Sequence, residues 1–383
     1  MALSPMLIIG CGGSGGKVVL NLRQRLNEEL LRRGWTAGIP DAFQLKWVDV
    51  PTPQETHPSF GPPLPLDDYV ALSNVDDYRA YDKTLVQQAG PQRMDRLVGW
   101  RPSPDIPLPV KAGAGQMRAI GRAVAVSKAA AVTSVINQAT QKMTSGRSEL
   151  ARLTEFLGGD GVSDTPLVVI VSSMAGGTGA GIFLDVCDLV RASNPALGNR
   201  IMAVLFTAEI FRDVGNTSGM PSNTVAAASE LMNSALAIQR RVEPLYNMAG
   251  AIAVEEGAGP SVSYVVGLQT MQDGRSLASP EECYRAVTES LLAMTIDEDL
   301  QQQVLAYDAA NAVPARAVRR SGLSMLAESP GNDVPIRTGF VSSFGSSKVS
   351  VGSGRFGEWA RDRLARSVVD YLSLIHISEP TRL

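Results

Sequence analysis

Residues 174–181 have the sequence Met174-Ala175-Gly176-Gly177-Thr178-Gly179-Ala180-Gly181 and connect two apolar segments. The segment before them, 167–171, predicts a buried parallel strand, and the segment after them, 182–190, predicts a helix with an apolar face. Glycines let a backbone approach a phosphate closely, and a helix N-terminus offers unpaired N–H groups and the positive end of a dipole. This C-terminal glycine segment therefore predicts a phosphate-binding loop. A tight turn without any ligand is the alternative interpretation.

A second segment of this kind, the N-terminal glycine segment, covers residues 10–16. It lies between a predicted strand at 6–9 and a helix predicted from Lys17 to about Arg33. The segment reads Gly10-Cys11-Gly12-Gly13-Ser14-Gly15-Gly16, and Gly10, Gly12 and Gly15 fit the fingerprint G-x-G-x-x-G. We interpret Cys11 as a small residue that the turn tolerates. Two such segments are more than a simple dinucleotide-binding fold uses, since that fold has one, at its first strand.

A third segment, the middle glycine segment, covers residues 111–122 and contains Gly113, Ala114 and Gly115 before it ends in Gly121-Arg122. With it, the sequence resembles the tubulin/FtsZ superfamily of GTP-binding proteins. In that family a glycine-rich loop follows the first strand, a γ-phosphate-sensing loop reads G-A-G-x-x-P-x-x-G-R, and the signature G-G-G-T-G-[ST]-G follows the fourth strand. Here Ala175 replaces the first signature glycine, Ala180 replaces the Ser or Thr, and the proline is missing.

The resemblance is greatest to the bacterial tubulin-like domain proteins and covers about residues 5–371, including the stretch 340–345. It implies an α/β fold: a tubulin-like, Rossmann-type nucleotide-binding domain with a mostly parallel sheet, a central helix and a second α+β domain. We expect these parts at 1–272, at 273–300 (the central helix and its following loop) and at 301–371, where the second domain is truncated. Residues 372–383 look like a translated sequencing adaptor, so we expect the natural protein to continue past Tyr371.

The resemblance also implies how the three segments would bind GTP and Mg²⁺. The N-terminal segment, with Gly10, Cys11, Gly12, Gly13, Ser14 and Gly15, would hold the α- and β-phosphates. The C-terminal segment, Ala175-Gly176-Gly177-Thr178-Gly179-Ala180-Gly181, would hold the β- and γ-phosphates, and Gly113-Ala114-Gly115 would sense the γ-phosphate. Such a site works by positioning phosphates and neutralising their charge. No residue distinguishes guanine from adenine, so the choice of GTP rests on the resemblance alone.

Four polar residues outside these segments are further candidates for the nucleotide site. Asp49 ends a strand predicted at 43–50, and the resemblance implies contact with nucleotide and metal there, although a turn residue at a strand end is the alternative. Glu209, Arg212 and Asn223 lie in a loop and helix start that approach the ribose in the family. Asn223 fits an N-cap position equally well.

Hydrolysis is less well supported by the sequence. Ser279, Pro280 and Glu282 predict the capped start of a long helix, which resembles the family's central helix. In filaments of that family, an acid after this helix completes the active site of the next subunit. The G-x-x-N-x-D-type motif is absent here, and the nearest acids are Asp297, Glu298 and Asp299. Asp297 and Asp299 are the catalytic candidates, and the alternative is that they belong to a solvated helix end. The resemblance also implies that the protein self-associates into filaments or oligomers.

Composition favours a cytoplasmic protein. The chain has 383 residues, of which 44% are hydrophobic, and a net charge of −3, which predicts no attraction to nucleic acid or anionic membranes. No apolar run approaches the roughly 20 residues of a membrane-spanning helix. Three separated cysteines without metal-binding spacing favour a reducing compartment, and the two histidines argue against a Ser-His-Asp triad or a histidine-based zinc site.

Two other functional classes stay open. An NAD(P)-binding Rossmann oxidoreductase would use the N-terminal segment and an acid about 20 residues beyond it. Asp41 and Asp49 lie 26 and 34 residues past Gly15, and no suitable catalytic histidine is present, so this interpretation ranks second. A scaffold that binds nucleotide without hydrolysing it is the other class, and the incomplete acidic motif favours it.

Overall fold

The computed structural model describes residues 2–74, 77–89, 101–198, 200–215, 217–235, 259–269, 276–311, 341–343 and 359–369. Residues 1–345 form one compact unit and residues 346–383 form another, in which residues 359–369 are helical. Most of the second domain expected at 301–371, and all of the adaptor-like segment 372–383, lie outside the described residues. The expected domain boundaries therefore stay predictions.

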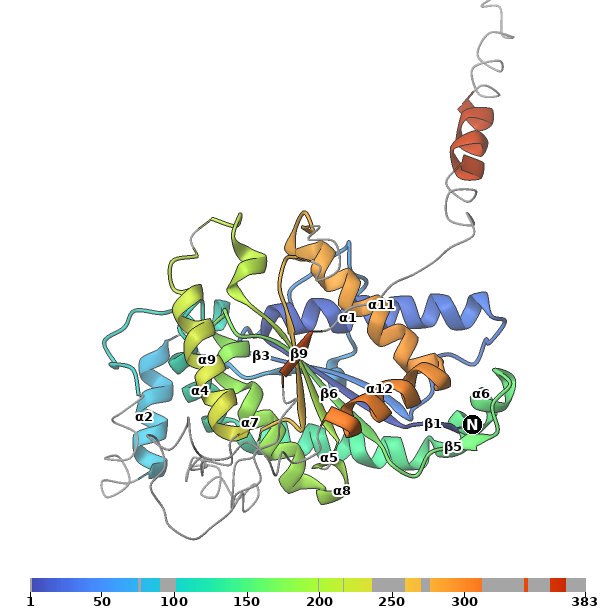
Figure 1. Cartoon of the computed structure of the whole chain (residues 1–383). Coiled ribbons are helices and arrows are strands. Elements are labelled where there is room, and N and C mark those ends of the chain that lie inside the picture. Colours follow the sequence, from blue (N-terminus) through green and yellow to red (C-terminus); the bar gives the residue numbers. More distant parts are fainter. Residues whose placement is uncertain are drawn as a thin grey trace, which may run out of the picture. The chain divides into compact units, whose positions relative to one another are not determined.

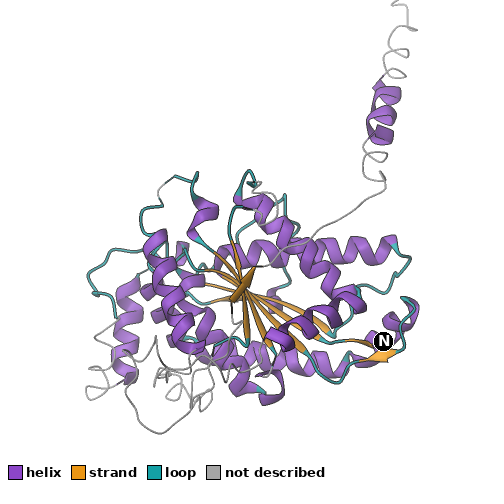
Figure 2. Cartoon of the chain, in the orientation of Figure 1, coloured by secondary structure: helices purple, strands orange, loops and turns teal. Residues whose placement is uncertain are grey.

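The first unit is built around a parallel sheet that has seven strands in the described residues (Figures 1 and 2). Their order across the sheet is β4-β3-β2-β6-β7-β8-β9. The strands are β2 (Met6–Cys11), β3 (Phe43–Asp49), β4 (Tyr69–Ala71), β6 (Leu167–Ser173), β7 (Ile201–Phe206), β8 (Val262–Val266) and β9 (Val341–Ser343). Two short strands, β1 (Ala2–Leu3) and β5 (Gly161–Val162), form a separate parallel pair. The predicted α/β fold with a mostly parallel sheet is confirmed.

Strands β2, β6 and β7 form because most of their side chains are apolar on both faces, whereas β3 also buries Gln44 and Lys46. Every residue of β2, β3, β6 and β7 is buried. Leu7 and Ile9 of β2 belong to one hydrophobic cluster, whereas Met6 and Ile8 belong to the cluster on the opposite face. Since alternate side chains of a strand point to opposite faces, helices must cover both sides of this sheet.

Helices on the two faces complete the layers. One face carries α1 (Gly12–Arg32), α6 (Arg147–Phe156) and α11 (Pro280–Ile296). The other carries α2 (Tyr78–Ala89), α4 (Arg118–Ser127), α5 (Ala129–Ser145), α7 (Thr178–Ser193), α8 (Pro195–Gly198) and α9 (Met220–Ala235). Short 3-10 turns are η1 (Leu66–Asp68), η2 (Val110–Ala112) and η3 (Ala208–Phe211), and α12 (Glu298–Asn311) follows α11.

Two predicted helix boundaries are corrected. The first helix begins at Gly12 and not at Lys17, so most of the N-terminal glycine segment is itself helical. The alanine- and valine-rich run 121–143 by itself predicts one buried helix, but the structure has two, α4 and α5, which meet at 72° around Lys128. The bend lets α4 pack on α7 while α5 also reaches β2 and β3. No single helix among the described residues is long and apolar enough to span a membrane.

Residues 51–65 form a proline-rich excursion, whose prolines predict irregular structure; it is irregular but anchored in the core. Phe60 is only 2% exposed and Leu64 only 5% exposed, and both pack with the cluster beneath α1.

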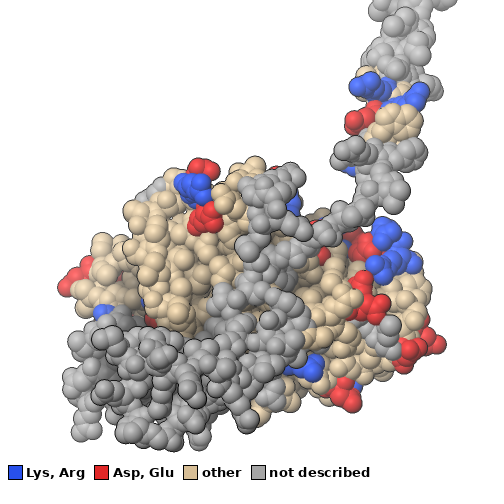
Figure 3. Space-filling model, viewed as in Figure 1, with Lys and Arg blue, Asp and Glu red and all other residues tan. Residues whose placement is uncertain are grey.

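On the face shown in Figure 3, basic and acidic side chains are interspersed rather than gathered by sign.

Candidate nucleotide-binding site

The N-terminal and C-terminal glycine segments leave the sheet where its strand order reverses. From β2 the chain goes to β3 and β4 on one side, and from β6 it continues to β7 and β8 on the other. Cys11, the last residue of β2, pairs in register with Ser172 of β6. The carboxyl ends of neighbouring strands at such a switch point form a crevice, which is where open α/β sheets bind ligands.

The N-terminal and C-terminal glycine segments touch each other at this point. A Cβ atom at Gly12 would lie 2.7 Å from the amide nitrogen of Gly179, and one at Gly179 would lie 2.9 Å from the carbonyl oxygen of Cys11. Gly12 has a φ of 71°, which favours glycine, and its carbonyl accepts a hydrogen bond from Trp47 Nε1 at 3.1 Å. The two segments therefore form one continuous surface.

The middle glycine segment joins the same surface. A Cβ atom at Gly177 would overlap the carbonyl oxygen of Gly115 and would lie 2.9 Å from that of Ala114. Gly121, in the first turns of α4, is also tightly packed: a Cβ atom there would lie 2.6 Å from the Gly177 carbonyl oxygen. The structure thus brings together three segments that are far apart in the sequence.

The glycines divide into two groups by what surrounds them. At Gly13, Gly115 and Gly176 an added Cβ would meet no heavy atom closer than 3.9 Å, so these three face open space. The other glycines of the segments fit tightly against neighbouring backbone or rings; they are Gly10, Gly12, Gly15, Gly16, Gly121, Gly177, Gly179 and Gly181. Gly113 lies between the groups, with a Cβ position 3.6 Å from Pro51. Sequence spacing does not separate them, because the distinction depends on tertiary neighbours.

Two helix N-termini point into the crevice without side-chain caps. Cys11 before α1 makes no capping hydrogen bond through its side chain, and Gly177 before α7 has no side chain that could cap. Neither first turn contains an acidic residue. By contrast, Ser279 caps α11 by accepting from the Glu282 N–H at 3.4 Å, as predicted. Uncapped first turns leave N–H groups available for an anion, which the helix dipole also favours.

Asp49, the last residue of β3, is almost completely buried, with 3% exposure. Burial raises the pKa of its carboxyl group to about 6, although hydrogen bonds from the Val50 N–H and the Thr178 hydroxyl act in the opposite direction. The nearby Glu55 carboxylate raises this pKa further. The bond to Val50 fits the strand-end interpretation of Asp49, and the bond to Thr178 connects it to the C-terminal glycine segment.

Asn223 is not an N-cap, because α9 begins at Met220 and places it in the first turn. Its Nδ2 donates to the carbonyl oxygens of Gln116 at 2.7 Å and Ala175 at 3.0 Å, with that of Gly176 at 3.5 Å. Its side chain therefore joins the middle and C-terminal glycine segments. This role gives no sequence signal, because it needs three segments to meet.

Glu209 and Arg212 form a pair with each other at 3.0 Å. Glu209 Oε2 also accepts from the Leu268 N–H at 3.3 Å, so this carboxylate is directed toward the end of β8. The Arg212 side chain is 57% exposed. Among the described residues, neither side chain makes a recorded bond to the glycine segments, so their contact with a nucleotide stays a prediction.

Asp297 and Asp299 lie at the opposite end of the sheet from the glycine segments. Near the start of α11, the Tyr284 hydroxyl lies 3.1 Å from Ser14 Oγ of the N-terminal segment. Thirteen residues separate Tyr284 from Asp297, which corresponds to about 20 Å along a helix axis. Both aspartates line a separate hollow of about 280 Å³ with Leu3. Asp297 Oδ1 accepts from the Leu300 N–H at 3.0 Å and so caps α12.

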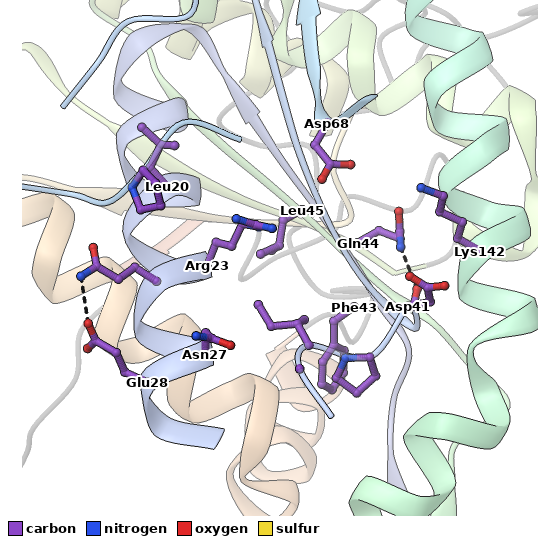
Figure 4. A pocket seen from close by; sticks show the side chains of 15 residues that line it. Leu20, Arg23, Asn27, Glu28, Asp41, Phe43, Gln44, Leu45, Asp68 and Lys142 are labelled. Atoms are coloured by element: carbon purple, nitrogen blue, oxygen red, sulfur yellow. Dashed lines mark hydrogen bonds between the residues drawn. The ribbon is translucent and has the colours of Figure 1, made fainter. Parts of the chain in front are cut away.

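A larger cavity of about 520 Å³ lies beside the first residues of β3 and is not part of this crevice. Figure 4 shows its lining between α1 and α5, with Arg23 and Lys142 from the two helices and Asp41 and Asp68 from the loops around β3. Because Phe43 starts β3 whereas Asp49 ends it, this cavity lies toward the amino ends of the strands.

The sequence of the chain matches the model of the family described as "Tubulin like" over residues 7–370. This chain belongs to that tubulin-like family. A comparison with curated protein sequences found no match.

Several solved structures are similar to this tubulin-like chain. CetZ from Methanosaeta thermophila is 11% identical, with a TM-score of 0.38, over 82% of this chain and 56% of that one. CetZ2 from Haloferax volcanii, described as a GTPγS-bound protofilament, is 13% identical, with a TM-score of 0.41, over 81% and 64%. TubZ of Clostridium botulinum phage c-st is 12% identical, with a TM-score of 0.36, over 78% and 65%. The chain thus spans less than two thirds of each.

Three residues next to the glycine segments escape sequence analysis. Tyr284 bonds Ser14, Trp47 lies against Gly16 so closely that no Cβ fits there, and the Glu55 carboxylate lies 3.9 Å from the Cβ position of Gly13. The aromatic residues look like ordinary core positions in the sequence. Glu55 lies in the proline-rich excursion, where no periodic pattern marks it.

The Cys11 thiol is fully buried, which raises its pKa and fits its interpretation as a small tolerated residue.

Proposed function

We propose that this tubulin-like chain binds GTP with Mg²⁺ in the crevice formed by its three glycine segments. The observation that carries the proposal is their convergence at the uncapped N-termini of α1 and α7. Three open glycines, Gly13, Gly115 and Gly176, one from each segment, leave room for phosphate oxygens against the backbone. Membership of the tubulin-like family favours this nucleotide over NAD(P), which would need only the N-terminal segment.

The acidic groups of the crevice fit a divalent cation. A phosphate on Gly13 would lie next to the Glu55 carboxylate, and the two negative charges would repel each other without a cation between them. Asp49 supplies a second carboxylate near Thr178. The described residues hold no group of three or more metal-ligating side chains, so phosphate oxygens and water would complete an octahedral Mg²⁺ shell. When bound, Mg²⁺ would neutralise phosphate charge.

We further propose that GTP turnover, if it uses Asp297 or Asp299, requires a second copy of the chain. These acids lie about 20 Å along α11 from the residue that contacts the N-terminal segment, so they cannot reach their own crevice. A head-to-tail contact would bring them to the crevice of the next copy. The capping bond that Asp297 accepts from the Leu300 N–H supports the alternative of a nucleotide-binding scaffold with little hydrolysis.

The test is a calorimetric titration of the purified chain with GTP, ATP and NAD at matched concentrations, with Mg²⁺ and with EDTA. We expect GTP to bind best and to lose affinity in EDTA. Tighter binding of NAD than of either triphosphate would contradict the proposal, and equal affinity with and without Mg²⁺ would contradict the cation site.

A further inference from the structure

Asn223 and Gln116 connect three elements around the crevice. The Nδ2 group of Asn223 donates to the Gln116 and Ala175 carbonyl oxygens, at 2.7 and 3.0 Å, and we call these two bonds the Asn223 bridge. In return, Gln116 Oε1 accepts from the Gly219 N–H at 2.9 Å, just before α9. Gly219 and Asn223 lie four residues apart, so the turn that leads into α9 holds both the side chain and the main chain of Gln116.

The part of the middle glycine segment that precedes Gln116 has little conformational preference of its own. Gly113 has a φ of 127° and Gly115 a φ of 55°, and Gly115 is exposed with open space around its Cβ position. Glycine loses more backbone freedom on ordering than other residues, so holding such a segment in one conformation is costly. Bonds from outside the segment must therefore fix it.

Other contacts hold the two ends of the segment. The Thr52 N–H donates to the Lys111 carbonyl oxygen at 3.2 Å at its start, and ion pairs hold its helical end in α4. Arg118 of α4 pairs with Glu230 of α9, and Arg122 pairs with the buried Asp185 of α7 at 3.0 Å. These ion pairs hold α4 between two helices. The Asn223 bridge instead acts on Gln116, the residue that follows Gly115 directly.

We propose that Asn223 is a positioning residue: its bridge orders the middle glycine segment against the C-terminal one and thereby sets the preference of the site for a nucleoside triphosphate over the diphosphate. The inference rests on the proposed function, in which Gly113–Gly115 contacts the γ-phosphate. A triphosphate uses the ordered segment and a diphosphate does not. The ordering contributed by the bridge therefore appears in the affinity for the triphosphate alone.

A direct contact between Asn223 and the nucleotide would behave differently. Both Nδ2 hydrogens are used by carbonyl oxygens, so only Oδ1 is left to accept a bond from a ribose hydroxyl. The ribose is common to the triphosphate and the diphosphate. Loss of such a contact would weaken both nucleotides equally.

The experiment compares Asn223→Ala with Asn233→Ala, a control that removes an exposed asparagine from the same helix. Affinities for a non-hydrolysable GTP analogue and for GDP are measured by calorimetry. For Asn223→Ala we expect GTP-analogue affinity to fall about tenfold and GDP affinity to change less than about twofold. The Asn233→Ala variant should bind both as the wild type does.

Gln116→Ala provides a second variant, because it removes the bond to the Gly219 N–H but keeps the carbonyl of the bridge. Gln116→Ala should also lower the ratio of GTP-analogue affinity to GDP affinity. The double variant should lower this ratio by less than the two single variants do together, in free-energy terms. Equal losses for both nucleotides in Asn223→Ala, or no loss for either, would overturn the inference.

Hydrogen exchange of the nucleotide-free protein separates this inference from the proposed function. The Met117 amide donates to the Ala114 carbonyl at 3.0 Å, which closes the turn of the middle segment. Asn223→Ala should accelerate exchange of the Met117 amide, and Asn233→Ala should not. If the wild type binds neither nucleotide, the proposed function fails; if exchange in the segment is unchanged, the bridge does not order it and the inference fails.

Discussion

Gly177 lies so close to Gly115 that a Cβ atom at position 177 would overlap the Gly115 carbonyl oxygen. The two residues belong to different glycine segments, 62 positions apart in the sequence. Gly177 therefore serves the packing of one segment on the other, whereas the adjacent Gly176 has no heavy atom within 4 Å of its Cβ position. Neighbouring glycines in one motif thus have different physical reasons to be glycine.

This difference predicts opposite results for alanine substitution at the two positions. Gly176→Ala should leave the free energy of unfolding within about 0.5 kcal/mol of the wild type but reduce nucleotide affinity at least about tenfold. Gly177→Ala should lower the free energy of unfolding by about 1–3 kcal/mol, because backbone must move to admit the methyl group. Urea denaturation and calorimetry check both. Normal nucleotide binding by Gly176→Ala would mean that this glycine does not face the phosphates.

The bond between Ser14 and Tyr284 predicts a link between the core and nucleotide affinity. The Tyr284 ring is 1% exposed and packs edge-on against Phe206, with ring centroids 5.1 Å apart. Tyr284→Phe keeps this packing but removes the bond that holds the first turn of α1. We expect a stability loss of about 1 kcal/mol and a nucleotide affinity lower by about three- to fivefold.

Tyr81→Phe is the matched control for that variant. The Tyr81 hydroxyl donates to Asn74 Oδ1 at 2.9 Å, and the ring is 3% exposed, but neither residue belongs to a glycine segment. Its stability loss should be similar, whereas its nucleotide affinity should equal that of the wild type. Similar affinities for the two variants would show that the Ser14 contact does not reach the site.

The buried carboxyl group of Asp49 predicts how stability depends on pH. Its pKa is about 6 in the folded chain, against an ordinary value of 3.8, mainly because of burial. The folded state thus binds the proton more tightly than the unfolded state. The stabilising effect of this proton is complete below about pH 4 and is lost as the pH rises through about 6.

Asp49→Asn removes this titration while keeping the shape of the side chain. Relative to the wild type, the variant should gain about 2–3 kcal/mol in the free energy of unfolding between pH 4 and pH 7, at about 1.36 kcal/mol per pKa unit. Denaturation curves of both proteins at five pH values, without nucleotide, measure this difference in the free energy of unfolding. A flat difference between Asp49→Asn and the wild type would mean that Asp49 is ionised throughout.

Local patterns predict the fold well because each signal lies within one segment. The strands at 6–9, 43–50 and 167–171 and the three glycine segments are visible as runs of apolar residues and glycines. The start of α1 at Gly12 is not visible in the sequence, since it depends on close packing against Trp47. The bend at Lys128 is not visible either, since it depends on packing against α7. The roles of Asn223 and Gly177 likewise depend on residues 48 to 107 positions away.

Turnover of GTP is the last expected outcome, and it follows from the distance between the acids and the crevice. Asp297 and Asp299 cannot orient water in their own site, and Asp297 already caps α12 through the Leu300 N–H. Positioned phosphates without an oriented water leave most of the hydrolytic barrier in place. We therefore expect slow phosphate release, with a specific rate that hardly rises with protein concentration. A steep rise that Asp299→Asn abolishes would show instead that the exposed acid of one copy completes the site of another.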